Sequence, residues 1–153
     1  MSVEWRPAGR VRRFVATGID AVLVPALTIL LVMVTNVAED AEDYADAWWM
    51  AHVLGLAVLS YLLLNGYWLW RGGQTVGKRL LGVSIRDARQ PDRVAPLWRL
   101  VLIRGWFFAA AFLVVVPWLT LLPLIDHLLI FLRHRRCLHD WLAGTVVMQR
   151  VEH

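Results

Sequence analysis

Residues 14–38 read FVATGIDAVLVPALTILLVMVTNVA, and this stretch decides which kind of fold the chain can adopt. Its only formal charge is Asp20. A bilayer core about 30 Å thick is crossed by about 20 apolar residues in an α-helix, so the stretch is long enough to span it. It also lacks the polar face that a surface helix of a soluble protein turns to water. The pattern predicts a transmembrane helix over residues 14–37.

Two further apolar runs follow the first. Residues 47–70 carry no formal charge, and residues 105–132 carry only Asp126. The run at 47–70 predicts a second transmembrane helix. The chain of 153 residues is 59% hydrophobic and 18% charged, whereas soluble domains are about 45–50% apolar and about 25% charged. This composition argues against a disordered chain or a soluble enzyme domain, and the single cysteine excludes a disulfide scaffold.

A secretory signal peptide is the alternative interpretation of the first run, because arginines precede it. The apolar stretch is too long for a signal peptide, and no small-residue cleavage site follows it. We therefore expect the protein to retain this helix.

The basic and acidic residues are segregated along the chain. All 16 lysines and arginines lie at residues 6–13 or at and beyond Arg71, whereas the loop between the first two runs holds five carboxylates and no basic residue. Lysine and arginine concentrate in the cytoplasmic loops of membrane proteins. The N-terminus and residues 71–96 are therefore expected in the cytoplasm, and the acidic loop outside. The pI near 10 reflects this basic face, and no nucleic-acid partner is expected.

The third run can cross the membrane in more than one way. A single crossing would place the basic residues 133–136 outside, against the charge rule. Pro117 and Pro123 interrupt the run, and proline breaks or kinks a helix. We favour a helical hairpin with legs at 97–116 and 119–133, which returns residues 134–153 to the cytoplasm. A re-entrant segment and a single crossing remain the alternatives.

Two short segments outside the apolar runs have the alternation of β-strands. Residues 81–87 (LGVSIRD) and 144–150 (GTVVMQR) are rich in β-branched side chains. If they pair, both must lie on one side of the membrane. The expected fold is an all-α membrane protein with two transmembrane helices, a Pro-turned helical hairpin and a small cytoplasmic β pair.

The ionisable residues inside the apolar runs are the candidates for function. Asp20 follows Arg13 by two helical turns, so both project from one helix face. A charge within a membrane helix costs at least about 2.5–3.5 kcal/mol, so Asp20 should face other helices and pair or become protonated. A proton- or cation-binding role and a structural ion pair are both open. At a similar depth we expect a polar layer that binds a cation, a proton or an anionic headgroup, formed by Asp20, Asn65, Arg104 and Asp126.

Asp140 follows His139 near the C-terminus, outside the apolar runs. It can cap a short helix or pair with Arg13 at the membrane interface. A His-Asp pair without a serine or cysteine nucleophile in register does not indicate hydrolysis, so no catalytic residues and no enzyme activity are expected. The histidines show no metal-ligand spacing, and no metal or other cofactor is expected.

A glycine-rich segment follows the second run. Residues 72–78 (GGQTVGK) resemble a nucleotide-binding loop, but Arg79 stands where the Mg²⁺-binding Ser or Thr is required. We expect a tight turn instead. The nearby basic side chains would contact anionic lipid headgroups, as would those after the third run. The residues assigned to this contact are Lys78, Arg79, Arg133, Arg135 and Arg136.

Three segments together carry a family resemblance. The motifs RRFVATGID (12–20), GQTVGKRLLGVSI (73–85) and RRCLHDWLAGTVV (135–147) resemble the RDD family of small polytopic membrane proteins. The family is named after one arginine and two aspartates. By motif the arginine matches Arg13 and the first aspartate Asp20. The second aspartate matches Asp140, with Asp126 as the alternative.

The resemblance implies a single membrane domain over residues 1–153 with a transport-related role. The alternative is a non-catalytic accessory or scaffold subunit of a larger membrane complex, because so small a chain encloses little pathway by itself. The expected partners are the lipid bilayer and either further copies of the chain or other membrane subunits. The expected location is the bacterial inner membrane, with both termini in the cytoplasm.

Overall fold

The computed structural model describes residues 4–40, 48–104, 121, 125–126, 128–129 and 137–151. Most of the regular structure is helical, and three short strands form one sheet. In chain order the elements are β1 (Glu4–Pro7), α1 (Arg10–Val34), α2 (Val37–Asp40), α3 (Trp48–Gly72), α4 (Val76–Leu80), β2 (Val83–Asp87), the π-helical turn η1 (Arg99–Arg104), α7 (Leu138–Leu142) and β3 (Thr145–Val151).

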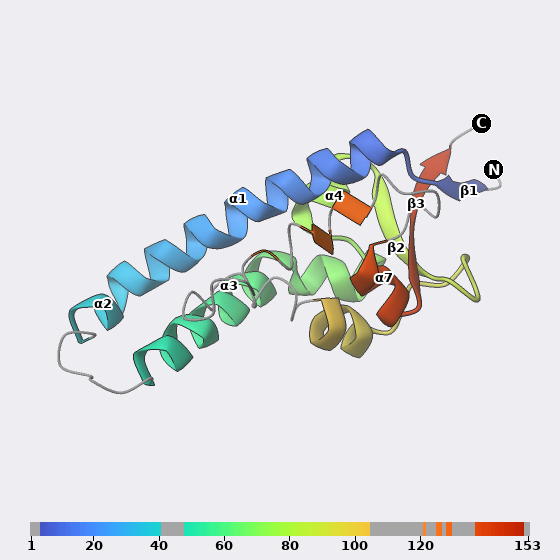
Figure 1. The fold of residues 1–153 in the computed structure, drawn as a ribbon. Helices are drawn as coiled ribbons and strands as arrows, with labels where there is room; N and C mark the ends of the chain where they lie inside the picture. Colours follow the sequence, from blue (N-terminus) through green and yellow to red (C-terminus); the bar gives the residue numbers. More distant parts are fainter. Residues whose placement is uncertain are drawn as a thin grey trace.

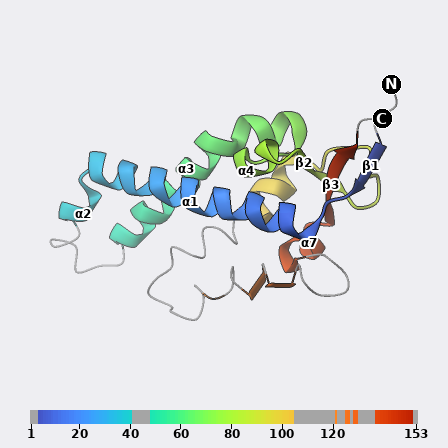
Figure 2. The same ribbon diagram turned by 90° about the horizontal axis from the view of Figure 1, so that it is seen from above.

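Helices α1 and α3 form the long axis of the molecule. They pack side by side, with α2 at one end and the sheet and both termini at the other (Figures 1 and 2). They occupy the two runs in which transmembrane helices were predicted, with boundaries shifted by a few residues. Both are long and apolar enough to cross a membrane.

Helix α1 is polar on the inside and apolar on the outside. Its buried residues recur every three or four positions and include charged and hydroxyl side chains. Large apolar side chains point outward instead, and Val22, Met33 and Val34 are each more than two-thirds exposed. In a membrane the lipid tails cover such a surface, and small or polar side chains mediate helix packing. The buried residues are Arg13, Ala16, Asp20, Val24 and Thr28.

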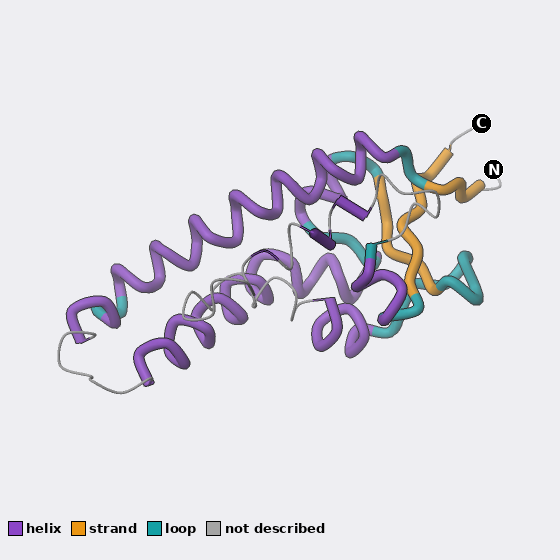
Figure 3. The backbone as a smooth tube through the Cα atoms, in the orientation of Figure 1, coloured by secondary structure: helices purple, strands orange, loops and turns teal. Residues whose placement is uncertain are grey.

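The sheet has the order β1-β3-β2 with antiparallel neighbours throughout (Figure 3). The predicted pairing of residues 81–87 with 144–150 is confirmed, with Val83 opposite Gln149 and Asp87 opposite Thr145. The predicted pair is nevertheless incomplete, because β1 adds a third strand on the other side of β3. Its four residues are too few to show alternation, and Pro7 suits only an edge strand.

The end of α3 is tied directly to β2. Gly73 has a left-handed φ of 61°, and its carbonyl accepts a hydrogen bond of 2.7 Å from the backbone N–H of Ile85. The hydroxyl of Ser84 donates to the carbonyl of Gly72 at 2.6 Å. A side chain at position 73 would collide with the Ile85 carbonyl, so glycine is required in this turn. These contacts fix where α4 lies relative to the two long helices.

The third apolar run falls almost entirely outside the described residues. The structure describes η1, which ends directly before this run, and within the run only residues 121, 125–126 and 128–129. The predicted legs of the hairpin at 97–116 and 119–133 are therefore largely outside the part of the chain that can be compared.

Candidate functional site

The carboxylate of Asp20 lies on the inner face of α1 and is 1% exposed. Its Oδ1 accepts a hydrogen bond of 2.8 Å from the backbone N–H of Gly77. Its Oδ2 accepts a hydrogen bond from the hydroxyl of Thr75 and lies 3.6 Å from the ammonium nitrogen of Lys78. Every one of these donors comes from the start of α4.

Side chains from three elements satisfy the first backbone N–H groups of α4. The N–H of Val76 donates to Oδ1 of Asn65 on α3 at 2.8 Å, and that of Gly77 donates to Asp20 on α1. The N–H of Lys78 donates to the N-cap hydroxyl of Thr75. A helix start has no internal acceptors for these groups, so α4 is held in place by its capping side chains. We call Asp20, Asn65, Thr75, Gly77 and Lys78 the α4 cluster.

Gly77 allows α4 to approach α1 closely. A Cβ atom at this position would lie 2.1 Å from the backbone carbonyl oxygen of Ala16 and 3.1 Å from Cγ of Asp20. The first contact is with backbone, which cannot move aside as a flexible side chain can. The glycine is therefore a packing requirement of the α4 cluster.

The position of Lys78 differs from the one expected from the sequence. It was assigned to lipid headgroups, but the residue is 4% exposed, and its ammonium points at Asp20 and Thr75. The expectation was wrong because a carboxylate from α1 lies beside it and supplies a buried counter-charge. Arg79 is exposed, and its guanidinium stacks 3.6 Å from the ring centroid of Trp68. Three further residues assigned to headgroups lie outside the described residues, namely Arg133, Arg135 and Arg136.

A second buried group forms where α1 meets α7. Nη2 of Arg13 lies 2.6 Å from Oδ2 of Asp140, and the two side chains are 6% and 0% exposed. Oδ1 of Asp140 also accepts a hydrogen bond of 3.2 Å from the hydroxyl of Thr145. Of the two structural roles considered for Asp140, the structure shows pairing with Arg13. The N-cap of α7 is Cys137, whose side chain makes no capping hydrogen bond.

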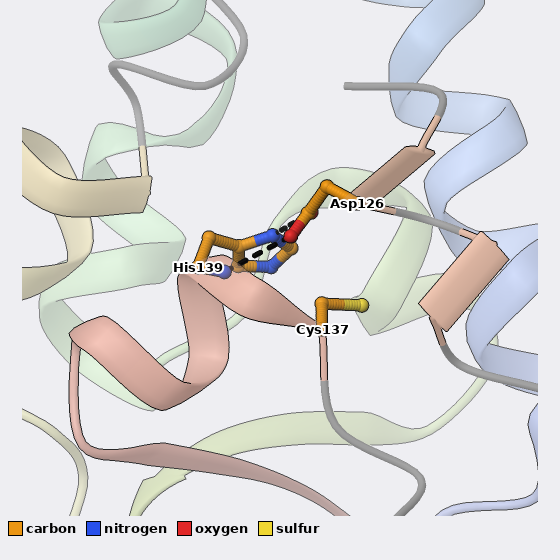
Figure 4. A group of neighbouring side chains, drawn as sticks. All are labelled: Asp126, Cys137 and His139. Atoms are coloured by element: carbon orange, nitrogen blue, oxygen red, sulfur yellow. Dashed lines mark hydrogen bonds and ion pairs between the residues drawn. The ribbon is translucent and has the colours of Figure 1, made fainter. Parts of the chain in front are cut away.

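Asp126 approaches the same helix from the third apolar run. Its Oδ1 accepts a hydrogen bond of 3.0 Å from the backbone N–H of His139, and its Oδ2 bonds to Nδ1 of the imidazole (Figure 4). The other ring nitrogen, Nε2, lies 3.6 Å from Oδ1 of Asp140. Cys137 lies nearby, with its sulfur 3.9 Å from Nη2 of Arg13. We call Arg13, Asp126, Cys137, His139 and Asp140 the α7 cluster.

Of the four residues predicted to form one polar layer, the structure brings Asp20 and Asn65 together and shows Asp126 in other surroundings. Asp20 and Asn65 both cap α4, whereas the contacts described for Asp126 are with α7. The side chain of Arg104 lies outside the described part of the chain. Helix α1 links the two clusters, because Arg13 and Asp20 lie on its buried face two turns apart.

Sequence reasoning missed several members of these clusters. Threonine is a preferred N-cap residue, and Thr75 directly precedes the first residue of α4. This signal in the sequence could have identified it. For the association of Asp126 with Cys137 and His139 there was no signal, because sequence spacing does not indicate which part of the third run returns to α7.

Comparison with known proteins identifies the family of this chain. Residues 7–144 match the RDD family, which is most of the sequence. The chain belongs to the RDD family. Searches of the curated proteins and of the solved structures found no match. RDD proteins are membrane proteins, which agrees with the two apolar helices of this chain. In this RDD protein the residues assigned to the family motif, Arg13, Asp20 and Asp140, are all buried at these clusters.

Replacing Gly77 by alanine should destabilise the RDD protein by about 1–3 kcal/mol, because the added methyl group overpacks the contact between α4 and α1. The measurement is unfolding of the purified protein in detergent. Gly18→Ala is the matched control, since a Cβ there meets nothing within 4 Å, and alanine is the better helix former. Equal stability of the two variants would contradict the close packing of α4 on α1.

Breaking the Arg13–Asp140 pair from either side should cost about 3–5 kcal/mol, because the remaining charge stays buried without its counter-charge. Arg13→Gln and Asp140→Asn should each show this loss in detergent unfolding. The double variant should lose clearly less than the sum of the two, since it leaves neither charge behind. Strict additivity would mean that the two residues contribute independently.

Proposed function

We propose that this RDD protein has a transport-related function in which the α4 cluster binds an ion or small solute. The observation that carries the proposal is a buried carboxylate, Asp20, that faces an ammonium and a hydroxyl and is the only formal charge in residues 14–38. Ionisable groups at membrane depth are costly and mark ion pathways and proton relays.

In this proposal the carboxylate of Asp20 exchanges the ammonium of Lys78 for another cation. Lys78 lies 3.6 Å from Asp20, farther than a tight charged hydrogen bond. A proton or small cation on the carboxylate would take over the role of the ammonium and release it. The neighbouring Thr75 hydroxyl supplies an additional oxygen for a cation.

The sheet supports a topology with both termini in the cytoplasm. It joins β1 before α1, β2 after α3, and β3 near the C-terminus. A hydrogen-bonded sheet of short strands lies on one side of a membrane, because lipid leaves open sheet edges unsatisfied. If α1 and α3 both span the membrane, β2 returns to the side of β1, and the predicted helical hairpin would return β3 to that same side. The basic residues support the proposal that this side faces the cytoplasm of a bacterial cell, with Arg79 and the cations after the third run at anionic headgroups.

An accessory or scaffold subunit is the second candidate function. The oxygens of Asp20 and Asp140 accept hydrogen bonds from donors within the chain, as expected of structural joints. A chain of 153 residues also encloses little pathway unless copies or other subunits assemble around it. Native mass in nanodiscs separates these cases, and copurification with transporter subunits at fixed stoichiometry would favour the accessory role.

The transport proposal predicts ion flux that depends on Asp20. Proteoliposomes with the purified protein should carry Na⁺, K⁺ or H⁺ faster than protein-free vesicles. Asp20→Asn should reduce the rate at least about tenfold, or about 1.4 kcal/mol. Asp92→Asn, at an exposed site outside the long helices, should leave the rate unchanged. Equal flux through protein-free and protein-containing vesicles would contradict the proposal.

The topology predicts opposite labelling of engineered cysteines. In a Cys137→Ser background, Glu42→Cys and Pro117→Cys should react with an impermeant maleimide added outside intact cells. Arg135→Cys should react only after the membrane is permeabilised. Labelling of Arg135→Cys from outside would rule out the hairpin.

A further inference from the structure

We propose that Asp126, Cys137 and His139 form a binding site for a transition-metal ion of the Zn²⁺ type. Each residue offers one ligand atom, a carboxylate oxygen, a thiol sulfur and an imidazole nitrogen, and these atoms lie within 4.8 Å of one another. Figure 4 shows the carboxylate and the imidazole facing each other, with the cysteine side chain beside them. This site is separate from the α4 cluster and does not depend on the transport proposal.

The donor set selects the metal. Sulfur and imidazole nitrogen with one carboxylate suit Zn²⁺ and similar borderline ions, whereas Mg²⁺ and Ca²⁺ require oxygen ligands. Zinc bonds of about 2.0–2.3 Å place tetrahedral ligand atoms about 3.3–3.8 Å apart. The three atoms already lie within 4.8 Å of one another. To reach this spacing, the direct contact between the Asp126 carboxylate and the His139 imidazole must open to admit the ion. Three protein ligands leave a fourth position for water or a further side chain.

The orientation of His139 is compatible with metal binding through Nδ1. Its Nδ1 faces Asp126, while Nε2 lies 3.6 Å from Oδ1 of Asp140. Metal-bound histidines commonly direct their second ring N–H to a carboxylate, which fixes the ring and its tautomer. Asp140 is itself held by Arg13 and by the Thr145 hydroxyl. The buried ion pair of the family motif would therefore support the metal site from outside.

Charge and burial also fit a divalent cation. Asp126, Cys137 and His139 are 1%, 2% and 6% exposed. A carboxylate and a thiolate together balance the two charges of Zn²⁺, and Arg13 with Asp140 forms a neutral pair beside them. Metal binding requires a thiolate at Cys137 and an unprotonated Nδ1 at His139, so any proton on these two atoms leaves as the ion binds.

The first test uses the full chain without a polyhistidine tag, purified in detergent and dialysed with Co²⁺ in place of Zn²⁺. Cys137 is the only cysteine in the sequence, so a thiolate-to-Co²⁺ charge-transfer band can come from no other residue of the chain. We expect one Co²⁺ per chain with this band, and its loss when Zn²⁺ displaces Co²⁺. Failure of the wild-type protein to bind Co²⁺ or Zn²⁺, or binding without the band, would overturn the proposal.

Variants then assign the ligands by the change in Zn²⁺ affinity. Cys137→Ser, Asp126→Asn and His139→Gln should each weaken binding by well over tenfold, and Asp140→Asn by about 10–100-fold as an outer support. His52→Gln is the control, because this exposed histidine lies near the start of α3 and should leave the affinity unchanged. A folded Cys137→Ser variant with unchanged affinity would overturn the proposal.

A thermal measurement on the wild-type protein covers the case in which a variant fails to fold. Zn²⁺ should raise the melting temperature, because a ligand that binds only the folded state stabilises it. Mg²⁺ at the same concentration should have no effect. An equal shift with both ions, or no shift with Zn²⁺, would show that the cluster is an ordinary ion pair beside a thiol.

Discussion

The carboxylate of Asp20 lies on the inner face of an apolar helix, and the placement of α4 follows from how that charge is satisfied. Lipid offers no water to solvate a carboxylate or the open N–H groups at a helix start. The carboxylate and the helix start satisfy each other, because Gly77 donates its backbone N–H to Asp20. The missing Cβ of Gly77 makes the contact possible, and Asn65 completes it from α3.

Helix α1 makes two such buried polar contacts from one face. Asp20 holds α4, which leads directly into β2, and Arg13 holds Asp140 of α7, which leads directly into β3. Strands β2 and β3 then pair with each other, and β3 also pairs with β1, which immediately precedes α1. These two contacts and the sheet therefore connect α1, α4, α7 and the three strands at one end of the molecule (Figure 1).

The two clusters differ in their chemistry although one helix face contributes to both. The α4 cluster offers oxygen atoms and an ammonium, which suits exchange with a proton or a hard cation. The α7 cluster offers sulfur, nitrogen and oxygen, which suits a transition metal. The Arg13–Asp140 pair lies between α1 and the second of these sites. It would act there by holding a carboxylate behind His139 rather than by touching the ion.

Much of the architecture follows from the sequence by itself. The two long helices follow from apolar length, because a run without charges can only be covered by lipid or by a large core. The pairing of β2 with β3 follows from alternation, although β1 was too short to show any. That Asp20 and Arg13 share a buried face follows from helical periodicity. Asp140 was one of the partners expected for Arg13. The partners of Asp20 did not follow from the sequence, since Lys78 was expected at lipid headgroups and is instead buried beside this carboxylate. The group of Asp126, Cys137 and His139 was likewise decided only by the tertiary structure, because close approach between segments depends on packing rather than on spacing along the chain.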